Sequence, residues 1–342
     1  MIEIKSLTIQ ELKQEMTEMG EKPFRAGQIF KWLHEGVESF EEMSNLSKAL
    51  RAKLAERFVL TVPQVVRRQV SQVDGTVKYL WRMRDGDCVE SVLMHYEHGV
   101  SVCVSTQVGC RMGCKFCASG QNGLKRHLSA GEILDEILFM QKDSGEKVSN
   151  IVLMGTGEPL DNYDNVLKFL HLVSCPEGIN IGQRHISLST SGIADKIERL
   201  AGEKLQITLS VSLHAPDDET RSSIMPVNEA YSIERLMQAC RYYFDTTGRR
   251  ISYEYMMADG RTDRPWQAEK LAKLLRGRPG HVNLIPLNEV EESPLRPSRP
   301  EAVRRFQQAL EKRGITATVR RRLGPDIDAA CGQLRRRELQ RQ

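Results

Sequence analysis

Along most of the chain, segments with the apolar repeat of a β-strand alternate with segments that have the apolar repeat of an α-helix. From residue 99 onward, short apolar runs are each followed by a segment with apolar positions three and four residues apart. The predicted strands cover residues 100–105, 150–154, 185–190, 205–213, 251–257, 282–286 and 315–319, and the helices 129–140, 163–173, 193–200, 232–245, 265–275 and 299–313. This alternation predicts an α/β fold with a parallel sheet, closed only as far as an incomplete (β/α)6 barrel.

The first part of the chain has different patterns. Residues 1–60 show helical periodicity over 8–19, 25–35 and 48–58, which predicts a small helical accessory domain. Its second helix mixes aromatic and basic residues, which suits contact with an RNA backbone, although packing in the domain's own core is the simpler interpretation. Residues 61–98 alternate polar and apolar positions around two Asp-Gly turns, so we expect a β-hairpin connection before a barrel of residues 99–320.

Composition narrows the class of protein. With 40% hydrophobic and 27% charged residues in 342, the chain has the make-up of a globular enzyme, and we expect it in the cytoplasm because no stretch is long enough to span a bilayer. Eight cysteines in such a protein do not form a disulfide framework. Clustered cysteines then indicate metal binding or catalysis.

Charge is unevenly distributed. From residue 296 to 342 there are 13 Lys and Arg against 5 Asp and Glu, a net of +8, which leaves 36 against 40, or −4, for the rest of the chain. The basic tail of residues 321–342 can neutralise phosphates of a nucleic acid. A solvated helix face explains the same charge, so both interpretations stay open.

Three cysteines stand together after the first barrel strand. Cys110, Cys114 and Cys117 have C-x3-C-x2-C spacing in a loop that also holds two glycines. A structural zinc site normally has four ligands, whereas a 4Fe-4S cluster held by three thiolates leaves one iron open for a small molecule. A zinc knuckle completed by a distant residue such as His127 is the alternative.

Polar or small residues also follow the other strands. In a parallel barrel the strand ends meet at one edge, where ligands bind, so together these positions predict a binding pocket, although each alone would be a cap or a turn. The candidates are Gly157, Glu158, Ser189, Ser212, Leu213, His214 and Asn288.

The three-cysteine loop and the Gly-Glu-Pro turn that follows the second strand resemble the radical S-adenosylmethionine superfamily. Over its whole length the chain resembles the RlmN/Cfr family of RNA methyltransferases within it. The stretches that carry this resemblance are residues 103–110, 154–160, 188–192, 211–216, 283–288 and 324–334.

The resemblance implies the cofactors and their ligands. Cys110, Cys114 and Cys117 are expected to hold one 4Fe-4S cluster, whose open iron chelates S-adenosylmethionine, with two such molecules used per turnover. Gly157 and Glu158 are expected near the amino group of that cofactor. The remaining pocket residues implied are Ser189, Ser212, Leu213, His214 and Asn288.

The resemblance also implies three catalytic residues. Cys331 is expected to take a methyl group from the first S-adenosylmethionine, and a 5′-deoxyadenosyl radical from the second then removes hydrogen from that methyl group so that its carbon adds to adenine. Glu90 is expected to accept the proton of the ring carbon, and Cys103 to release the base through a transient disulfide. Without the resemblance, Cys103 would be a buried strand cysteine and Glu90 a solvent-facing carboxylate.

The RlmN type implies 2-methyladenosine in 23S rRNA, at the peptidyl transferase centre, and in tRNA, at adenosine 37. It also implies a reductase such as flavodoxin or ferredoxin, and we expect a monomer. Cfr-type methylation at adenine C8 uses the same residues and stays open. A non-catalytic Fe-S RNA-binding protein is a further alternative, although binding alone requires neither Cys103 nor Cys331.

Overall fold

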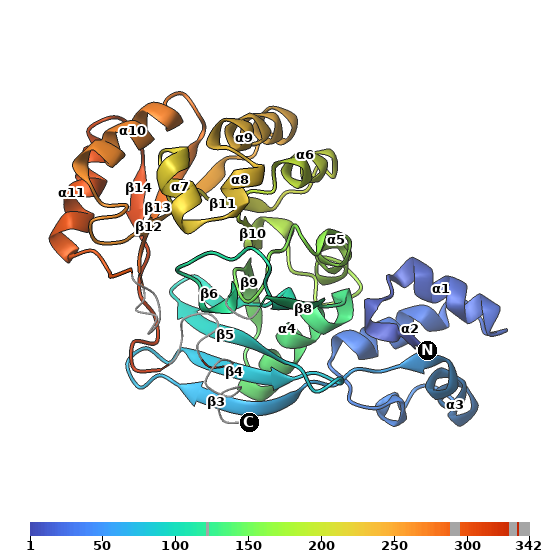
Figure 1. The fold of residues 1–342 in the computed structure, drawn as a ribbon. Coiled ribbons are helices and arrows are strands. Elements are labelled where there is room, and N and C mark those ends of the chain that lie inside the picture. Colours follow the sequence, from blue (N-terminus) through green and yellow to red (C-terminus); the bar gives the residue numbers. More distant parts are fainter. Residues whose placement is uncertain (121–122, 288–294, 328–333, 335–342) are drawn as a thin grey trace.

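The computed structural model describes residues 1–120, 123–287, 295–327 and 334, and it is built on one large sheet (Figure 1). The order of its ten strands is β14-β13-β12-β11-β10-β9-β6-β5-β4-β3. Their bounds are β3 Gln64–Val70, β4 Val77–Arg82, β5 Cys88–Tyr96, β6 Gly99–Cys103, β9 Val148–Leu153, β10 Ile186–Thr190, β11 Thr208–Ser212, β12 Ile251–Met257, β13 Gly280–Pro286 and β14 Ala317–Val319.

The strands from β6 to β14 are all parallel, and helices on the outer face connect them. Within the described residues β14 and β3 are the two ends of the sheet and do not pair, which confirms the incomplete barrel. No helix among these residues has the length and apolar character that a membrane span requires. The connecting helices are α4 Ala130–Ser144, α5 Tyr163–Val173, α6 Ala194–Gly202, α9 Ile233–Thr247, α10 Pro265–Leu275 and α11 Pro300–Glu311.

The hairpin segment continues the barrel sheet. Strands β3, β4 and β5 are antiparallel to one another, and β5 pairs antiparallel with β6 in a register that sets Val92 opposite Cys103. Helix α4 covers one face of these strands, where its Glu136 carboxylate accepts a hydrogen bond from the Ser91 hydroxyl. Side chains alternate between faces along a strand, so Glu90 and Val92 lie on the opposite face.

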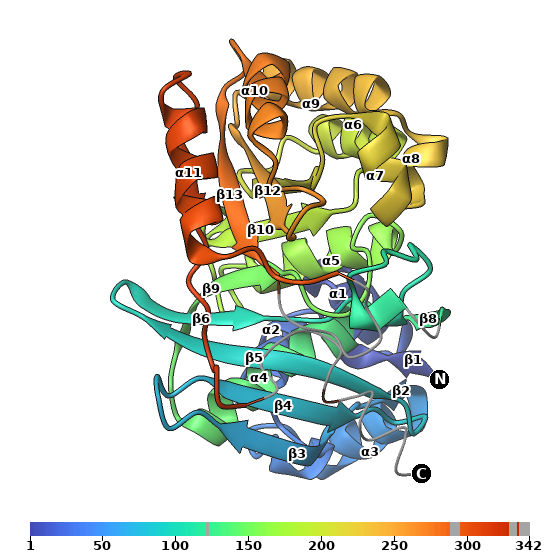
Figure 2. The same cartoon turned by 60° about the vertical axis from the view of Figure 1, so that its left-hand side comes forward.

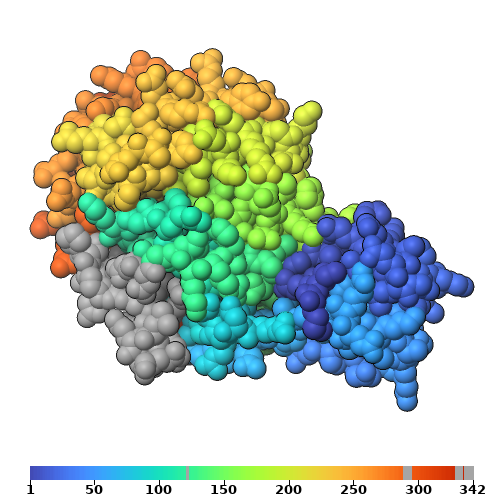
Figure 3. All heavy atoms as spheres, turned by 45° about the vertical axis from the view of Figure 1, so that its right-hand side comes forward, coloured from blue at the N-terminus to red at the C-terminus, as the bar shows by residue number. Residues whose placement is uncertain are grey.

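The N-terminal residues form a separate lobe beside the barrel (Figure 3). Its three predicted helices are present as α1 Ile9–Glu18, α2 Arg25–His34 and α3 Lys48–Arg57. Phe30 is buried in the core of this lobe, whereas Phe24 is 57% exposed. At least one aromatic residue of this segment therefore lies outside the core.

A buried ion pair joins this lobe to the barrel. Lys5 Nζ lies 2.6 Å from Asp135 Oδ1 of α4, and both side chains are almost fully buried. The ammonium also donates a hydrogen bond to the carbonyl of Thr61. Burial raises the pKa of Asp135 to about 6, and the charge of Lys5 opposes this rise. The carboxylate therefore depends on Lys5 to stay ionised in the interior.

The last described segment, residues 320–327, runs from β14 back to the opposite end of the sheet (Figure 2). The amide of Gly324 donates a hydrogen bond of 2.8 Å to Asp74 Oδ2, and Asp326 accepts one of 2.8 Å from the amide of Gln72. Both partners lie in the turn between β3 and β4. The tail is thus anchored at a point far from the strand that it follows.

We expect Lys5→Met to destabilise the protein by about 3 to 5 kcal/mol, since it leaves Asp135 buried without its charged partner. The matched variant Lys5→Met with Asp135→Leu removes both charges and is expected to recover most of this loss. Urea unfolding of the two variants measures the difference. Equal stability of the single variant and the wild type would show that the pair does not hold the lobe.

Candidate functional site

A short hairpin frames the cysteine loop. Strand β7 Gln107–Gly109 pairs with β8 Leu124–His127, and the Cys110 amide donates a hydrogen bond of 2.9 Å to the carbonyl of Gly123. Gly109 has φ +82°, and a Cβ atom there would clash with that carbonyl oxygen. Only glycine fits where the chain enters the loop.

The three thiols of the loop are close enough to influence one another. Burial, together with the charges of Glu158 and Cys117, raises the pKa of Cys110 to about 12, against the opposing effect of a backbone hydrogen bond at Met112. Burial also raises the pKa of Cys114, and the thiolates of Cys117 and Cys110 add to this effect. Three thiolates that repel one another, two of them removed from water, require a positively charged group among them, and an iron cluster is such a group.

The arrangement does not favour a zinc knuckle. His127 lies on β8 rather than in a loop, and its Nδ1 atom accepts a hydrogen bond of 3.0 Å from Gln107. Among the described residues, no three His, Cys, Asp or Glu side chains are grouped as a site for a single metal ion. A cubane cluster needs no such grouping, because its three cysteines bind three different irons. The donor set therefore fits the cluster.

The glycines after β9 allow two loops to touch. A Cβ atom on Gly155 would lie 2.5 Å from the carbonyl oxygen of Val104, and one on Gly157 would lie 2.7 Å from Thr106 Oγ1. The turn after β9 therefore packs directly against the segment that leads from β6 to the cysteine loop. In this part of the site, the glycines lack a side chain and so allow the two backbones to come into contact.

Glu158 is buried and binds backbone groups with both oxygens. Oε1 accepts a hydrogen bond of 3.0 Å from the Leu160 amide and Oε2 one of 2.6 Å from the Ser191 amide. Its own amide donates to the side chain of Gln107 at 2.8 Å. Burial raises the pKa of Glu158, and these backbone hydrogen bonds oppose the rise. Glu158 thereby links the loops after β6, β9 and β10.

A buried hydroxyl nearby, Thr106 Oγ1, has no hydrogen-bond partner within the described part of the chain. Burying an unpaired hydroxyl is unfavourable, so this atom fits a polar ligand at this edge of the sheet. The sequence patterns did not identify Thr106 as a pocket residue. The hydroxyl of Ser191 instead helps to lower the pKa of Glu158. The predicted Ser189 and Ser212 lie on β10 and β11 and are half-buried.

His214 joins the loop after β11 to the cysteine loop. Its ring lies edge-on to Phe116, with 4.9 Å between centroids, and its Nδ1 accepts a hydrogen bond from the Met256 amide. Burial lowers the pKa of His214 to about 3, so the ring is neutral. Leu213 beside it is fully buried. These two residues position the loop.

Glu90 and Cys103 lie on one face of the sheet. Glu90 is only 3% exposed, which corrects the solvent-facing position favoured by the hairpin pattern, and its carboxylate lies 2.7 Å from Lys78 Nζ. Cys103 ends β6 and clusters with Met94 and with Val92, which is two residues after Glu90, and Leu323 of the tail packs against this cluster. Lys78 was not identified from the sequence. Asn288 and Cys331 lie outside the described residues.

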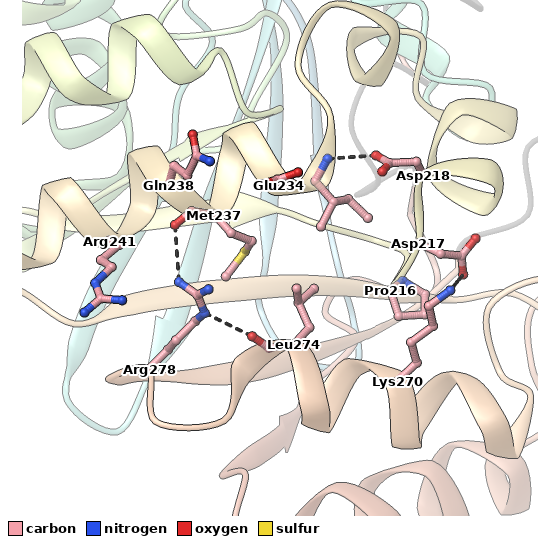
Figure 4. A pocket seen from close by; sticks show the side chains of 11 residues that line it. Pro216, Asp217, Asp218, Glu234, Met237, Gln238, Arg241, Lys270, Leu274 and Arg278 are labelled. Carbon is pink, nitrogen blue, oxygen red and sulfur yellow. Dashed lines mark hydrogen bonds and ion pairs between the residues drawn. The ribbon is translucent and has the colours of Figure 1, made fainter.

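A surface cavity of about 560 Å³ lies away from these residues, between α9 and α10 (Figure 4). Arg278 crosses it and donates a hydrogen bond to the carbonyl of Met237, and Lys270 lies 3.8 Å from Asp217. The cavity is on the outer layer of helices. Neither the cysteines nor Glu90 line it.

Comparison with known proteins assigns the family. Residues 104–273 match the model of the radical SAM superfamily, and residues 2–60 match that of the ribosomal RNA large subunit methyltransferase N-terminal domain. The probable dual-specificity RNA methyltransferase RlmN of Alkaliphilus oremlandii (strain OhILAs) is 52% identical over 339 residues, which cover 99% of each chain. This chain belongs to the RlmN family. The corresponding protein of Lachnoclostridium phytofermentans is 53% identical over 98% of this chain and 94% of its own.

The fold agrees with this assignment. The crystal structure of a radical SAM methyltransferase from Sphaerobacter thermophilus superposes with a TM-score of 0.93 at 45% identity, covering 97% of this chain and 99% of that one. The protein is therefore a radical SAM RNA methyltransferase of the RlmN type, which uses a 4Fe-4S cluster and S-adenosylmethionine.

We expect Gly155→Ala to reduce stability by about 1 to 3 kcal/mol, because its Cβ atom would clash with the Val104 carbonyl. Binding of S-adenosylmethionine to the cluster-loaded enzyme should weaken as well. Gly202→Ala at the end of α6 is the matched control, since its Cβ atom would meet nothing within 4 Å. Urea unfolding and calorimetry measure both effects, and unchanged binding in Gly155→Ala would contradict this role of the turn.

Proposed function

We propose that the enzyme makes 2-methyladenosine in 23S rRNA, at the peptidyl transferase centre, and in tRNA, at adenosine 37. The dual-specificity names of its relatives support this choice of substrates. The observation that carries the mechanism is the path of residues 320–327, in which Leu323 packs against the cluster of Val92, Met94 and Cys103 only eight residues before Cys331.

The bound cluster and two S-adenosylmethionine molecules supply a methyl group and a 5′-deoxyadenosyl radical. The Cys331 thiolate is the nucleophile that accepts the methyl group, and its sulfur then carries the methylene carbon to the adenine ring. An adenine carbon between two nitrogens is electron-poor and does not attack a sulfonium methyl group, so the chain must supply this carrier. A covalent link between RNA and Cys331 results.

Glu90 then accepts the proton from the ring carbon. Its carboxylate is buried, and Lys78 holds one of its oxygens at 2.7 Å. A base enclosed in this way is shielded from water and held in one orientation. Lys78 acts through Glu90 and is a positioning residue in this scheme.

Cys103 completes the turnover. Once the adduct has lost its ring proton to Glu90 and its unpaired electron to a one-electron carrier, the Cys103 thiolate attacks the sulfur of Cys331. A sulfur–sulfur bond forms as the sulfur–carbon bond breaks, the methylene carbon keeps the bonding electron pair and takes a proton from solvent, and the methylated base leaves. The same two thiols must afterwards be reduced. We propose that a flavodoxin or ferredoxin type of reductase supplies the electrons, and that the enzyme works as a cytoplasmic monomer.

RNA binding involves the basic tail and the N-terminal lobe. Arg320, Arg321 and Arg322 follow β14, and the exposed Phe24 lies beside Arg25 in the lobe, with the guanidinium 4.9 Å from the ring centroid. Guanidinium groups contact phosphates, and exposed aromatic rings stack on unpaired bases. Such contacts offset the few kcal/mol needed to remove the target adenosine from its stack.

Nucleoside mass spectrometry after turnover with 23S rRNA and tRNA tests the regiochemistry. We expect 2-methyladenosine in both RNAs. Formation of 8-methyladenosine would assign the Cfr-type reaction instead. RNA that is bound but unmethylated by the cluster-loaded, reduced enzyme would favour a non-catalytic RNA-binding protein.

We expect Cys103→Ala to accumulate RNA covalently attached to the protein, because no thiol remains to attack Cys331. Glu90→Gln should retain the adduct too, since release follows loss of the ring proton. A denaturing gel with labelled RNA detects the adduct. Cys240→Ala, a buried thiol of α9, is the control and should turn over normally. Wild-type rates in Cys103→Ala would remove this thiol from the mechanism.

A further inference from the structure

Arg221 is a fully buried arginine in the short helix α7 Asp218–Ile224. The mechanism above assigns it no role. Its guanidinium donates hydrogen bonds to the carbonyls of Ser191 (2.6 Å), Ser212 (3.1 Å), Leu213 (3.1 Å) and Tyr231 (3.5 Å) and to Asn228 Oδ1 (2.9 Å). Ser191 follows β10, Ser212 ends β11 and Leu213 follows it, so Arg221 holds the carboxyl ends of these two strands together.

Among the described residues no carboxylate forms a hydrogen bond or ion pair with the Arg221 guanidinium, although the charge of Asp218 acts on it from nearby. All five acceptors are neutral oxygens. Asp218, an acidic neighbour on the same helix, instead accepts hydrogen bonds from Asn228 Nδ2 and from the Ile233 amide, at 2.9 and 2.7 Å. A buried charge is unfavourable without an opposite charge nearby. Besides Asp218, the packing of α7 brings a second source of negative charge close to Arg221.

Helix α7 packs against the cysteine loop. The Lys115 amide donates a hydrogen bond of 3.0 Å to the carbonyl of Ile224, the last residue of the helix, and Cys114 packs in the apolar cluster of Ile224 and Met225. Burial lowers the pKa of Arg221 to about 10, and the thiolate of Cys114 is the largest influence that opposes this. Ile224 is three residues after Arg221 and therefore on the same side of the helix, so Arg221 lies on the side that packs against the cysteine loop.

We propose that Arg221 is a positioning residue that joins the cofactor loops to the cysteine loop, and that its charge stabilises the reduced cluster. The inference rests on the cluster held by Cys110, Cys114 and Cys117. When the cluster accepts one electron it gains one negative charge. A fixed positive charge in a medium of low dielectric constant then favours the reduced state over the oxidised state.

Two substitutions separate charge from geometry. Arg221→Gln and Arg221→Lys both remove the planar guanidinium, but only the first removes the charge. An anaerobic redox titration followed by electron paramagnetic resonance, with dithionite as the reductant, gives the midpoint potential. At the wild-type midpoint we expect about tenfold less reduced cluster relative to oxidised cluster in Arg221→Gln, a shift of about 59 mV. Arg221→Lys should stay close to the wild type in potential and bind S-adenosylmethionine more weakly.

A charge swap tests the proposal with Arg221 in place. Asp218→Asn combined with Asn228→Asp moves a carboxylate onto the guanidinium without changing the net charge of the protein. The amide introduced at position 218 can keep accepting from the Ile233 amide while it donates to the new carboxylate. We expect a more negative midpoint potential here too, so the proposal stays testable if Arg221→Gln fails to retain its cluster.

Arg235→Gln is the matched control. Arg235 lies on α9 and pairs with Asp195 and Glu198, so its loss should not change the potential. Equal midpoints in the wild type, the charge swap and Arg221→Gln, each with full iron and sulfide content, would overturn the proposal. A wild-type protein that takes up no cluster would instead contradict the proposed function, whatever the role of Arg221.

Discussion

A charge is tolerated inside a protein only when hydrogen bonds surround it, and the loops of this candidate site are built around two such charges. The carboxylate of Glu158 joins its own turn to the loop after β10 through the Ser191 amide. The guanidinium of Arg221 binds the carbonyl of the same Ser191 and continues to the loop after β11. The two charges therefore meet at one residue, which gives the open edge of the sheet a continuous polar framework.

The ion pair between Lys78 and Glu90 requires a different explanation from the charges of Glu158 and Arg221. Replacing a buried ion pair with apolar residues is often neutral or stabilising, so such a pair is weak evidence for stability. Its position is informative, since it lies on the face that carries Cys103 and that the tail crosses. If this position only had to fill the core, an apolar residue such as leucine or valine would be sufficient. The carboxylate is better explained by chemistry in a site shielded from water.

Local signals in the sequence were enough for the regular elements. Helices Tyr163–Val173 and Pro265–Leu275 and strand Ile251–Met257 have the bounds that the patterns predict, because Pro265 and the apolar repeats mark their ends. Helix α7 was missed, since seven mostly polar residues carry no clear repeat.

The contacts that make the site were harder to foresee. Lys78 meets Glu90 only because the register of β4 and β5 sets Leu80 opposite Glu90. The five acceptors of Arg221 come from two strand ends and from the segment after its own helix, and periodicity contains no information about their meeting. Family resemblance indicated the candidate reacting groups, whereas the contacts of Lys78 and Arg221 became visible only in three dimensions.

The tail shows how a thiol at the far end of the chain comes into range of the barrel. Bringing distant residues together carries an entropic penalty. The hydrogen bonds of Gly324 and Asp326 to the β3–β4 turn offset part of this penalty at positions that precede Cys331 in the chain. Cys331 is the fourth residue after Ile327, so covalent geometry keeps its Cα atom within about 14 Å of the Cα atom of Ile327. In the proposed mechanism its sulfur must reach the cofactor, the base and Cys103 in turn. The anchor on the β3–β4 turn therefore limits how far from that turn the proposed reactions of Cys331 take place.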